Sequence, residues 1–203
     1  MICIIQARMS SKRLPGKTLI KINGKTVLER VINNIKLSKK IKKIIVATST
    51  KNSDKAIIKI CKKNNILFTT GPLENVALRF IITLKKFPCK SFLRITGDSP
   101  LINHKILDKM ISLSKNKKFD ILTNTFPRTF PKGLSVEIIN TSTFKKYYKE
   151  FNKIEKEHIT SFFYNNFKRF IIKNYKSKKN LSNINLSVDT KKDLINISRI
   201  IKW

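Results

Sequence analysis

Short apolar runs alternate with amphipathic stretches through the first 120 residues of the chain. Apolar runs of strand length cover 1–6, 41–47, 66–69 and 91–96, and apolar residues recur at helical spacing in 27–35, 54–63, 74–85 and from 103 onward. Such alternation is typical of a parallel sheet with helices on both faces. The sequence therefore predicts an α/β fold whose ligand site lies at the carboxyl ends of the strands.

The pattern changes after Asp120. A loop rich in proline and aromatic residues covers 124–133, strands are predicted over 134–139, 170–175 and 185–188, and two helical stretches within 144–167 break near Asn152. Asp189 and Thr190 fit the N-cap of a last helix that runs to Ile201, because their side-chain oxygens can accept the free N–H groups of a first turn. With no internal repeat and no interdomain linker, residues 1–203 are predicted to form one domain.

The loop after the first predicted strand is rich in cations. It places Arg8, Lys12, Arg13 and Lys17 beside two serines and a glycine, a composition that suits a polyphosphate. A Walker A motif is incomplete here, because Ser11 stands where its first glycine should be. The residues after Lys17 also read as a hairpin with an Asn-Gly turn rather than as a helix. A P-loop kinase is thus disfavoured but remains an alternative.

A carboxylate follows another predicted strand. Asp98 comes after Gly97, which permits close approach of the backbone, and could bind Mg²⁺ together with substrate phosphates. An Asx-turn before Pro100 is the alternative role for this residue. Asp189 follows a later apolar segment in a similar way and is the candidate for a second metal ligand.

Composition adds a strong positive charge, with 44 Lys plus Arg against 12 Asp plus Glu and a formal net charge of +32. Lysine outnumbers arginine 36 to 8, whereas nucleic-acid surfaces concentrate arginine and aromatic residues on one face. We therefore expect attraction of anionic ligands without specific nucleic-acid binding, although a basic nucleic-acid-binding protein stays open as an alternative. The three cysteines lack C-x-x-C spacing and the apolar runs are too short for a membrane span, which predicts a cytoplasmic protein.

Seven motifs occur in order along essentially the whole chain, and together they resemble the cytidylyltransferase family. This family includes the CMP-KDO synthetases, the acylneuraminate cytidylyltransferases and the spore coat polysaccharide biosynthesis protein F group, to which the resemblance is closest. The motifs are QARMSSKRLPGK (6–17), VAT (46–48), ENVALR (74–79), RITGDSPLI (94–102), GLSVE (133–137), EHIT (157–160) and VDTKKDL (188–194).

The resemblance implies a nucleotide-diphospho-sugar transferase (GT-A-like) fold, a three-layer α/β/α structure with a mainly parallel sheet. It also implies the reaction of CTP with an acidic sugar to give a CMP-sugar and pyrophosphate, with Mg²⁺ as cofactor. Carried over to this chain, the family's pattern assigns the triphosphate to Arg8, Arg13 and Lys17, the base and ribose to Ala7, Thr96 and Arg79, and the metal to Asp98 and Asp189.

The same resemblance places the sugar pocket, and contacts of a homodimer, in an insertion over roughly 123–168. Arg94, Arg128, Glu137 and His158 are the candidate substrate-binding residues, and His158 could act as a general base, as a hydrogen-bond donor or only structurally. Relatives commonly read Asp-Gly-Leu-Asp-Val-Glu where this chain has KGLSVE (132–137), so two carboxylates of that pattern are missing. Other nucleotidyltransferases of the same fold, and a homologue that binds nucleotide without turnover, remain alternatives.

Overall fold

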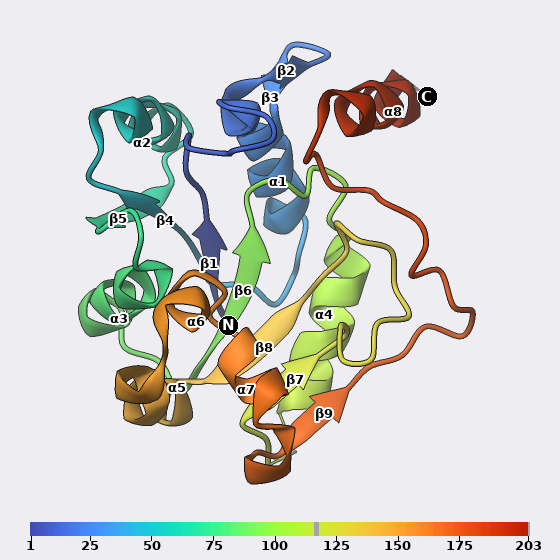
Figure 1. Ribbon diagram of the computed structural model, residues 1–203. Helices are drawn as coiled ribbons and strands as arrows, with labels where there is room; N and C mark the ends of the chain where they lie inside the picture. Colours follow the sequence, from blue (N-terminus) through green and yellow to red (C-terminus); the bar gives the residue numbers. More distant parts are fainter. Residues whose placement is uncertain (116–117, 203) are drawn as a thin grey trace.

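A seven-stranded sheet forms the centre of the computed structural model, which describes residues 1–115 and 118–202 (Figure 1). Its strand order is β5-β4-β1-β6-β8-β7-β9, and within the described residues β8 alone runs antiparallel to its neighbours. The sheet is therefore mainly parallel, as predicted. The strands are β1 (Ile2–Gln6), β4 (Lys43–Ser49), β5 (Leu67–Gly71), β6 (Ser91–Thr96), β7 (Ile121–Thr123), β8 (Glu137–Asn140) and β9 (Ile172–Asn174).

Helices cover both faces of this sheet and give the three layers that the sequence predicts. Successive side chains of a strand point to opposite faces, so Cys3 and Ile5 of β1 join one apolar cluster and Ile4 joins the other. The first cluster includes residues of α1 (Val27–Lys36), α2 (Lys55–Lys63) and α4 (His104–Ser114). The second includes residues of α3 (Val76–Lys86), α5 (Thr141–Tyr147) and α7 (Ser161–Asn165), with many phenylalanines.

A hairpin separates the basic loop from α1. Lys17 lies in a three-residue 3₁₀ turn, η1 (Lys17–Leu19), and β2 (Lys21–Ile22) pairs with β3 (Lys25–Thr26) across Asn23 and Gly24, which both have positive φ. Thr26 then caps α1 in a reciprocal capping box with Glu29. Because the lysine of a P-loop stands at the N-terminus of an α-helix, the P-loop alternative is wrong for this chain.

The second half of the chain departs from several predictions. The strand predicted over 134–139 begins only at Glu137, because the Asn124 side chain bonds the carbonyl of Leu134 and the N–H of Val136 and takes them out of the sheet. The strand predicted over 185–188 is also wrong, since an isolated bridge between Lys132 and Asn185 is the only strand-like pairing of this segment within the described residues. The short strand β7 escaped prediction altogether.

The helical stretch after β8 breaks where the sequence predicts. Asn152 forms a capping box at the start of α6 (Lys153–Glu157), and residues 158–160 separate α6 from α7. The last helix, α8 (Lys191–Lys202), is capped by Thr190, whose Oγ1 accepts from the N–H of Asp193 at 3.2 Å. The predicted capping role of the Asp189 side chain is wrong, because its carboxylate points to cations instead. Within residues 1–115 and 118–202, no helix is long and apolar enough to span a membrane.

Candidate active site

A cavity of about 630 Å³ lies where β1 and β6 end side by side. Most of the predicted site residues line it: Ala7, Arg8, Arg13, Lys17, Arg94, Thr96, Asp98, His158 and Asp189. The predicted residues Arg79, Arg128 and Glu137 are not among the lining residues. The rest of the lining is Gln6, Ser10, Ser11, Lys12, Thr18, Leu73, Glu74, Gly97 and Glu157. Leu73 and Glu74 escaped the sequence analysis as wall residues, although they stand directly before the N-terminus of α3.

The basic loop after β1 is held in shape by its own backbone and by a buried acid. Asp54 is fully buried, and its Oδ1 accepts from the N–H of Met9 at 2.8 Å. The hydroxyl of Thr18 donates to the carbonyl of Arg8 at 2.9 Å, which closes the loop on itself. These hydrogen bonds therefore fix the backbone of the loop that bears the cationic side chains. Asp54 had no signal in the sequence beyond its place at the start of a predicted helix.

Asp98 reaches the cavity through a close approach of two strand ends. The N–H of Gly97 donates to the carbonyl of Gln6 at 2.8 Å, and a Cβ at Gly97 would lie 3.0 Å from the Cβ of Ala7. The segment before α8 then docks on the same loop, because the N–H of Val188 donates to the carbonyl of Asp98 at 2.8 Å. These contacts bring Asp98 and Asp189 to the same place, as the sequence predicts.

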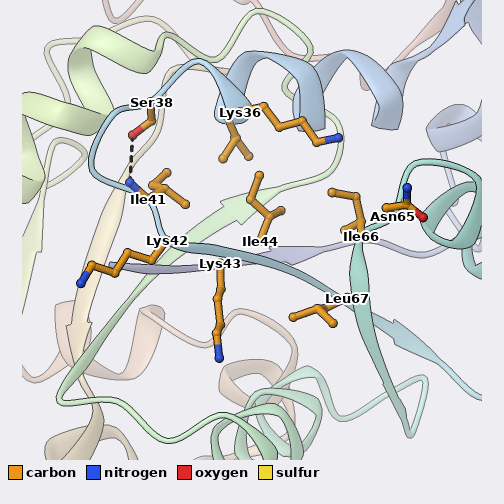
Figure 2. Close-up of a pocket in the computed structure, with 10 residues that line it drawn as sticks. Lys36, Ser38, Ile41, Lys42, Lys43, Ile44, Asn65, Ile66 and Leu67 are labelled. Atoms are coloured by element: carbon orange, nitrogen blue, oxygen red, sulfur yellow. Dashed lines mark hydrogen bonds between the residues drawn. The ribbon is translucent and has the colours of Figure 1, made fainter.

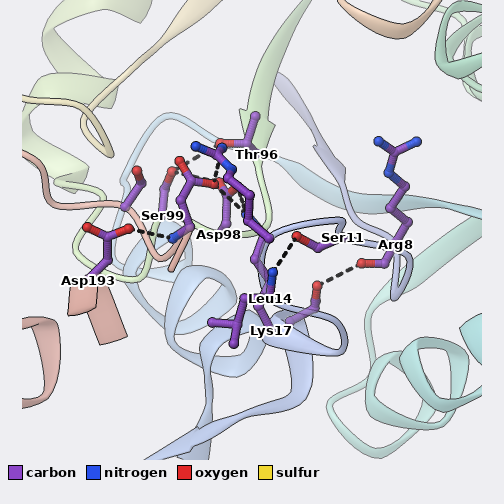
Figure 3. A network of polar contacts seen from close by, with 12 residues as sticks. Arg8, Ser11, Leu14, Lys17, Thr96, Asp98, Ser99 and Asp193 are labelled. Atoms are coloured by element: carbon purple, nitrogen blue, oxygen red, sulfur yellow. Dashed lines mark hydrogen bonds and ion pairs between the residues drawn. The ribbon is translucent and has the colours of Figure 1, made fainter. Parts of the chain in front are cut away.

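Lys17 joins the two carboxylates. Its Nζ lies 2.6 Å from Oδ2 of Asp98 (Figure 3). The same Nζ lies 2.8 Å from Oδ1 of Asp189, and Nη2 of Arg13 lies 3.0 Å from that oxygen. Burial alone would lower the pKa of Lys17, but the two carboxylates outweigh it and hold that pKa above its ordinary value. The ammonium is therefore charged at neutral pH.

The donor set at this point suits a hard divalent cation. Asp98 and Asp189 offer carboxylate oxygens, and no cluster of three or more His, Cys, Asp and Glu side chains exists in the described part of the chain. Mg²⁺ commonly binds through one or two carboxylates and takes its remaining ligands from substrate phosphates and water. These two residues fit that pattern. They do not fit the pattern of softer metals, which prefer His or Cys ligands.

An ion pair links the basic loop to α6 across the cavity. Arg8 donates to Glu157, and this hydrogen bond is the main reason why the pKa of Glu157 lies below its ordinary value. His158 follows at the end of α6 and lines the same wall. The motif EHIT (157–160) thus meets the basic loop directly.

A largely buried polar cluster lies behind the part of the cavity wall that Arg94 forms. Arg94 pairs with Glu137 and donates to Gln6 at 3.1 Å, and Glu137 also accepts from the hydroxyl of Tyr164. Burial raises the pKa of Tyr164 well above its ordinary value, and the charge of Glu137 adds to this shift. Arg128 donates to the hydroxyl of Ser135 at 3.0 Å. Glu137 therefore neutralises Arg94 from behind, and Arg94 alone of this cluster's charged residues reaches the cavity wall.

Arg79 lies inside the protein rather than in the cavity wall. Its side chain is 1% exposed, and in the described residues none of its three nitrogens has a hydrogen-bond partner. Burial, with a smaller contribution from Arg8, lowers its pKa to about 10. A Cβ at Gly71 would lie 2.9 Å from its Cγ, so β5 needs glycine at this point to accommodate the arginine. The predicted contact of Arg79 with base or ribose stays a prediction.

Another hollow, of about 300 Å³, lies at the amino ends of β4 and β5, away from the strand ends that carry the loops (Figure 2). It is lined by lysines and aliphatic residues, among them Lys36, Ile41, Lys43 and Leu67, and contains none of the predicted site residues. Its lining contains no carboxylate, histidine or cysteine, and so offers none of the side chains that usually hold a metal.

Comparison with known proteins agrees with the geometry. Residues 2–201 match the family described as cytidylyltransferase. The spore coat polysaccharide biosynthesis protein SpsF of Bacillus subtilis is 30% identical over 143 residues, which cover 68% of this chain and 58% of that protein. The chain thus spans a little over half the length of that relative.

Solved structures give the same picture. A cytidylyltransferase from Leptospira borgpetersenii superposes with a TM-score of 0.95 at 32% identity, over 99% of this chain and 86% of that one. A CMP-KDO synthetase in complex with CTP superposes with a TM-score of 0.76 at 15% identity, over 99% and 98% of the two chains, and so shares the fold. On the match over residues 2–201, this chain belongs to the cytidylyltransferase family.

Proposed function

We propose that this protein transfers the cytidylyl group of CTP to an acidic sugar, with Mg²⁺ as cofactor, and releases pyrophosphate. The observation that carries the proposal is the meeting of Asp98 and Asp189 on the ammonium of Lys17, at the mouth of the basic loop, in a chain of the cytidylyltransferase family. Support for CTP also comes from the synthetase of the same fold that is known in complex with it.

The residues divide the work of such a reaction. Arg8, Arg13 and Lys17 would bind the triphosphate and spread its charge as the acceptor hydroxyl attacks the α-phosphorus and pyrophosphate leaves. Mg²⁺, held by Asp98 and Asp189, would supply further neutralisation of the phosphate oxygens. Fixed cations of this kind stabilise a transition state by position, so no covalent intermediate on the protein is required.

The charges that line the cavity favour particular partners for the acidic acceptor. Lys12 and His158 line the cavity, and neither forms an ion pair within the described residues, whereas Arg94 is already neutralised by Glu137. An acceptor carboxylate would therefore pair with Lys12 or with His158 rather than with Arg94, and Arg128 is not among the lining residues. The hydroxyl proton would pass to His158 or to solvent. A role in surface polysaccharide synthesis is supported by the name of the Bacillus relative.

The first experiment is a thermal-shift panel with CTP, UTP, ATP and GTP, each with Mg²⁺ and with EDTA. Ligand binding raises the melting temperature by an amount set by affinity. We expect a Mg²⁺-dependent shift with CTP that exceeds the other three. Equal shifts for all four nucleotides would show polyphosphate binding without recognition of the base and would contradict cytidylyl transfer. Acidic sugars can then be compared by pyrophosphate release.

Two further expectations concern the assembly and partners. We propose a homodimer in the cytoplasm, which a monomeric mass by light scattering at micromolar concentration would contradict.

Specific nucleic-acid binding is the competing function suggested by the net charge of +32. A gel shift with sequence preference, in addition to the steep salt dependence that any strongly basic protein shows, would favour it.

A further inference from the structure

Lys17 occupies the space in which a divalent cation bridging Asp98 and Asp189 would sit. Its Nζ lies 2.6 Å and 2.8 Å from one oxygen of each carboxylate, and its side chain is 12% exposed, against 24% for each aspartate. A metal ion bound to the same two oxygens at the usual distance of about 2.1 Å would overlap an ammonium held this close. The two cations therefore cannot share this position.

From this geometry we infer that Lys17 is a built-in counter-ion which must leave the two carboxylates before the metal can bind, and that the triphosphate draws it away. The inference rests on the proposed metal site. It gives Lys17 a second role beside phosphate binding, namely to couple the loading of metal with the loading of nucleotide. Metal alone then competes with the ammonium and binds weakly. When metal and nucleotide bind together, the metal binds the two freed carboxylates and the triphosphate binds the ammonium.

The local fold allows this movement without rearrangement of the backbone. The N–H of Lys17 donates to the carbonyl of Leu14 at 3.2 Å, and the buried Thr18 beside it is bonded to Arg8, so the main chain is held on both sides. The four-carbon stem of a lysine lets its ammonium move several ångströms while its Cα stays in place. A shift of the side chain from carboxylate to phosphate is therefore sufficient.

The same loop provides a matched control. Lys12 carries the same charge and lines the same cavity, but within the described residues it forms no ion pair. Replacing it removes one positive charge from the site without freeing Asp98 or Asp189. Arg13 is less suitable, because its guanidinium also lies 3.0 Å from Asp189.

The test measures Mn²⁺ binding to the protein without nucleotide, by electron paramagnetic resonance of the free ion. We expect Lys17→Met and Lys17→Gln each to bind Mn²⁺ on the order of tenfold more tightly than the wild type, because a charge in direct contact with both ligands is removed. Lys12→Met should change the affinity by less than about threefold, since screening weakens a charge that makes no contact. The two variants at Lys17 guard against loss of folding in one of them, which circular dichroism reveals.

A second series repeats the titration with CTP present. In the wild type CTP should tighten Mn²⁺ binding more than it does in Lys17→Met, because only the wild type has an ammonium to withdraw. Equal affinity of Lys17→Met, Lys17→Gln and Lys12→Met for Mn²⁺ alone would overturn the inference, and the metal site would still stand if Asp98→Asn abolished binding in the presence of CTP. Absence of Mn²⁺ binding in all proteins, with and without CTP, would overturn both the inference and the proposed metal site.

Discussion

The two halves of the sheet build the site in different ways. In the parallel half, β5-β4-β1-β6, the central strands β4 and β1 are largely buried and apolar, and the basic loop and the Asp98 loop follow directly where β1 and β6 end. In the other half, β8-β7-β9, the strands have only three or four residues, and Asp189 arrives on an irregular segment tied to the Asp98 loop by one backbone bond. The proposed phosphate side therefore follows from regular structure, whereas the proposed sugar side and the second carboxylate depend on individual contacts.

The largest expected effect tests the point where the halves meet. Asp98→Asn keeps the shape of the side chain but removes its charge from the proposed metal position. We expect turnover to fall by at least about a hundredfold, because the proposed metal would lose one of its two carboxylates. The measurement is pyrophosphate release with CTP and an active acceptor. Glu150→Gln, which breaks a surface pair with Arg169, is the control and should retain full activity.

The next effect concerns the buried ion pair between Arg94 and Glu137. Glu137→Gln leaves Arg94 without its counter-ion. Water cannot easily replace that counter-ion, because the Arg94 and Glu137 side chains are only 13% and 6% exposed. An uncompensated buried charge typically costs about 3 kcal/mol in the free energy of unfolding. Urea denaturation at neutral pH measures this loss. A variant as stable as the wild type would show that Glu137 is not needed to balance Arg94.

Gly133 tests how the irregular segment is held. Its φ is 88°, and a Cβ would lie 2.4 Å from the backbone carbonyl carbon and oxygen of Leu186. Gly24 is the matched control, with φ of 75° and no atom within 4 Å of the place where a Cβ would stand. Gly24→Ala should cost about 1 kcal/mol through backbone strain alone.

Gly133→Ala should cost about 2 kcal/mol more, because the chain that carries Asp189 has to move as well. Urea denaturation compares the stabilities of the two variants, and a titration of CTP with Mg²⁺ compares their affinities. Equal losses in the two glycine variants would mean that contact with Leu186 does not position Asp189.

The smallest effect is the pH dependence of the stability that the ion pair between Arg8 and Glu157 contributes. The pKa of Glu157 is lowered by its hydrogen bond from Arg8, so the pair stabilises the fold above the ordinary glutamate pKa and the gain is lost as pH falls through the lowered value. The melting temperature of Glu157→Gln should lie slightly below that of the wild type at pH 7. The two should converge as the pH falls through the lowered pKa of Glu157. A difference that persisted in acid would point to a cause other than the charge of Glu157.

What the sequence could predict follows the same division. Helical spacing in 27–35 and buried runs such as 91–96 predict elements well, since burial on a regular element imposes a period on the sequence. Asn124 and Asp189 act through individual side-chain contacts, which leave no period, and so the start of β8 and the role of the Asp189 side chain were mispredicted, whereas Thr190 caps α8 as predicted. Motif resemblance located Asp98 and Asp189 together, but it gave no role to Glu74 of the ENVALR motif, and no pattern indicated Leu73 or the anchor Asp54.

The central claim is that one metal-dependent nucleotide site is shared by the two halves. Calorimetric titration of CTP in Mg²⁺ and in EDTA, on the wild type, Asp98→Asn and Asp189→Asn, tests it most directly. We expect Mg²⁺ to tighten CTP binding to the wild type by about tenfold or more, and both variants to lose this gain alike, since each aspartate supplies one ligand. Full Mg²⁺ dependence in Asp189→Asn, or none in the wild type, would contradict the account.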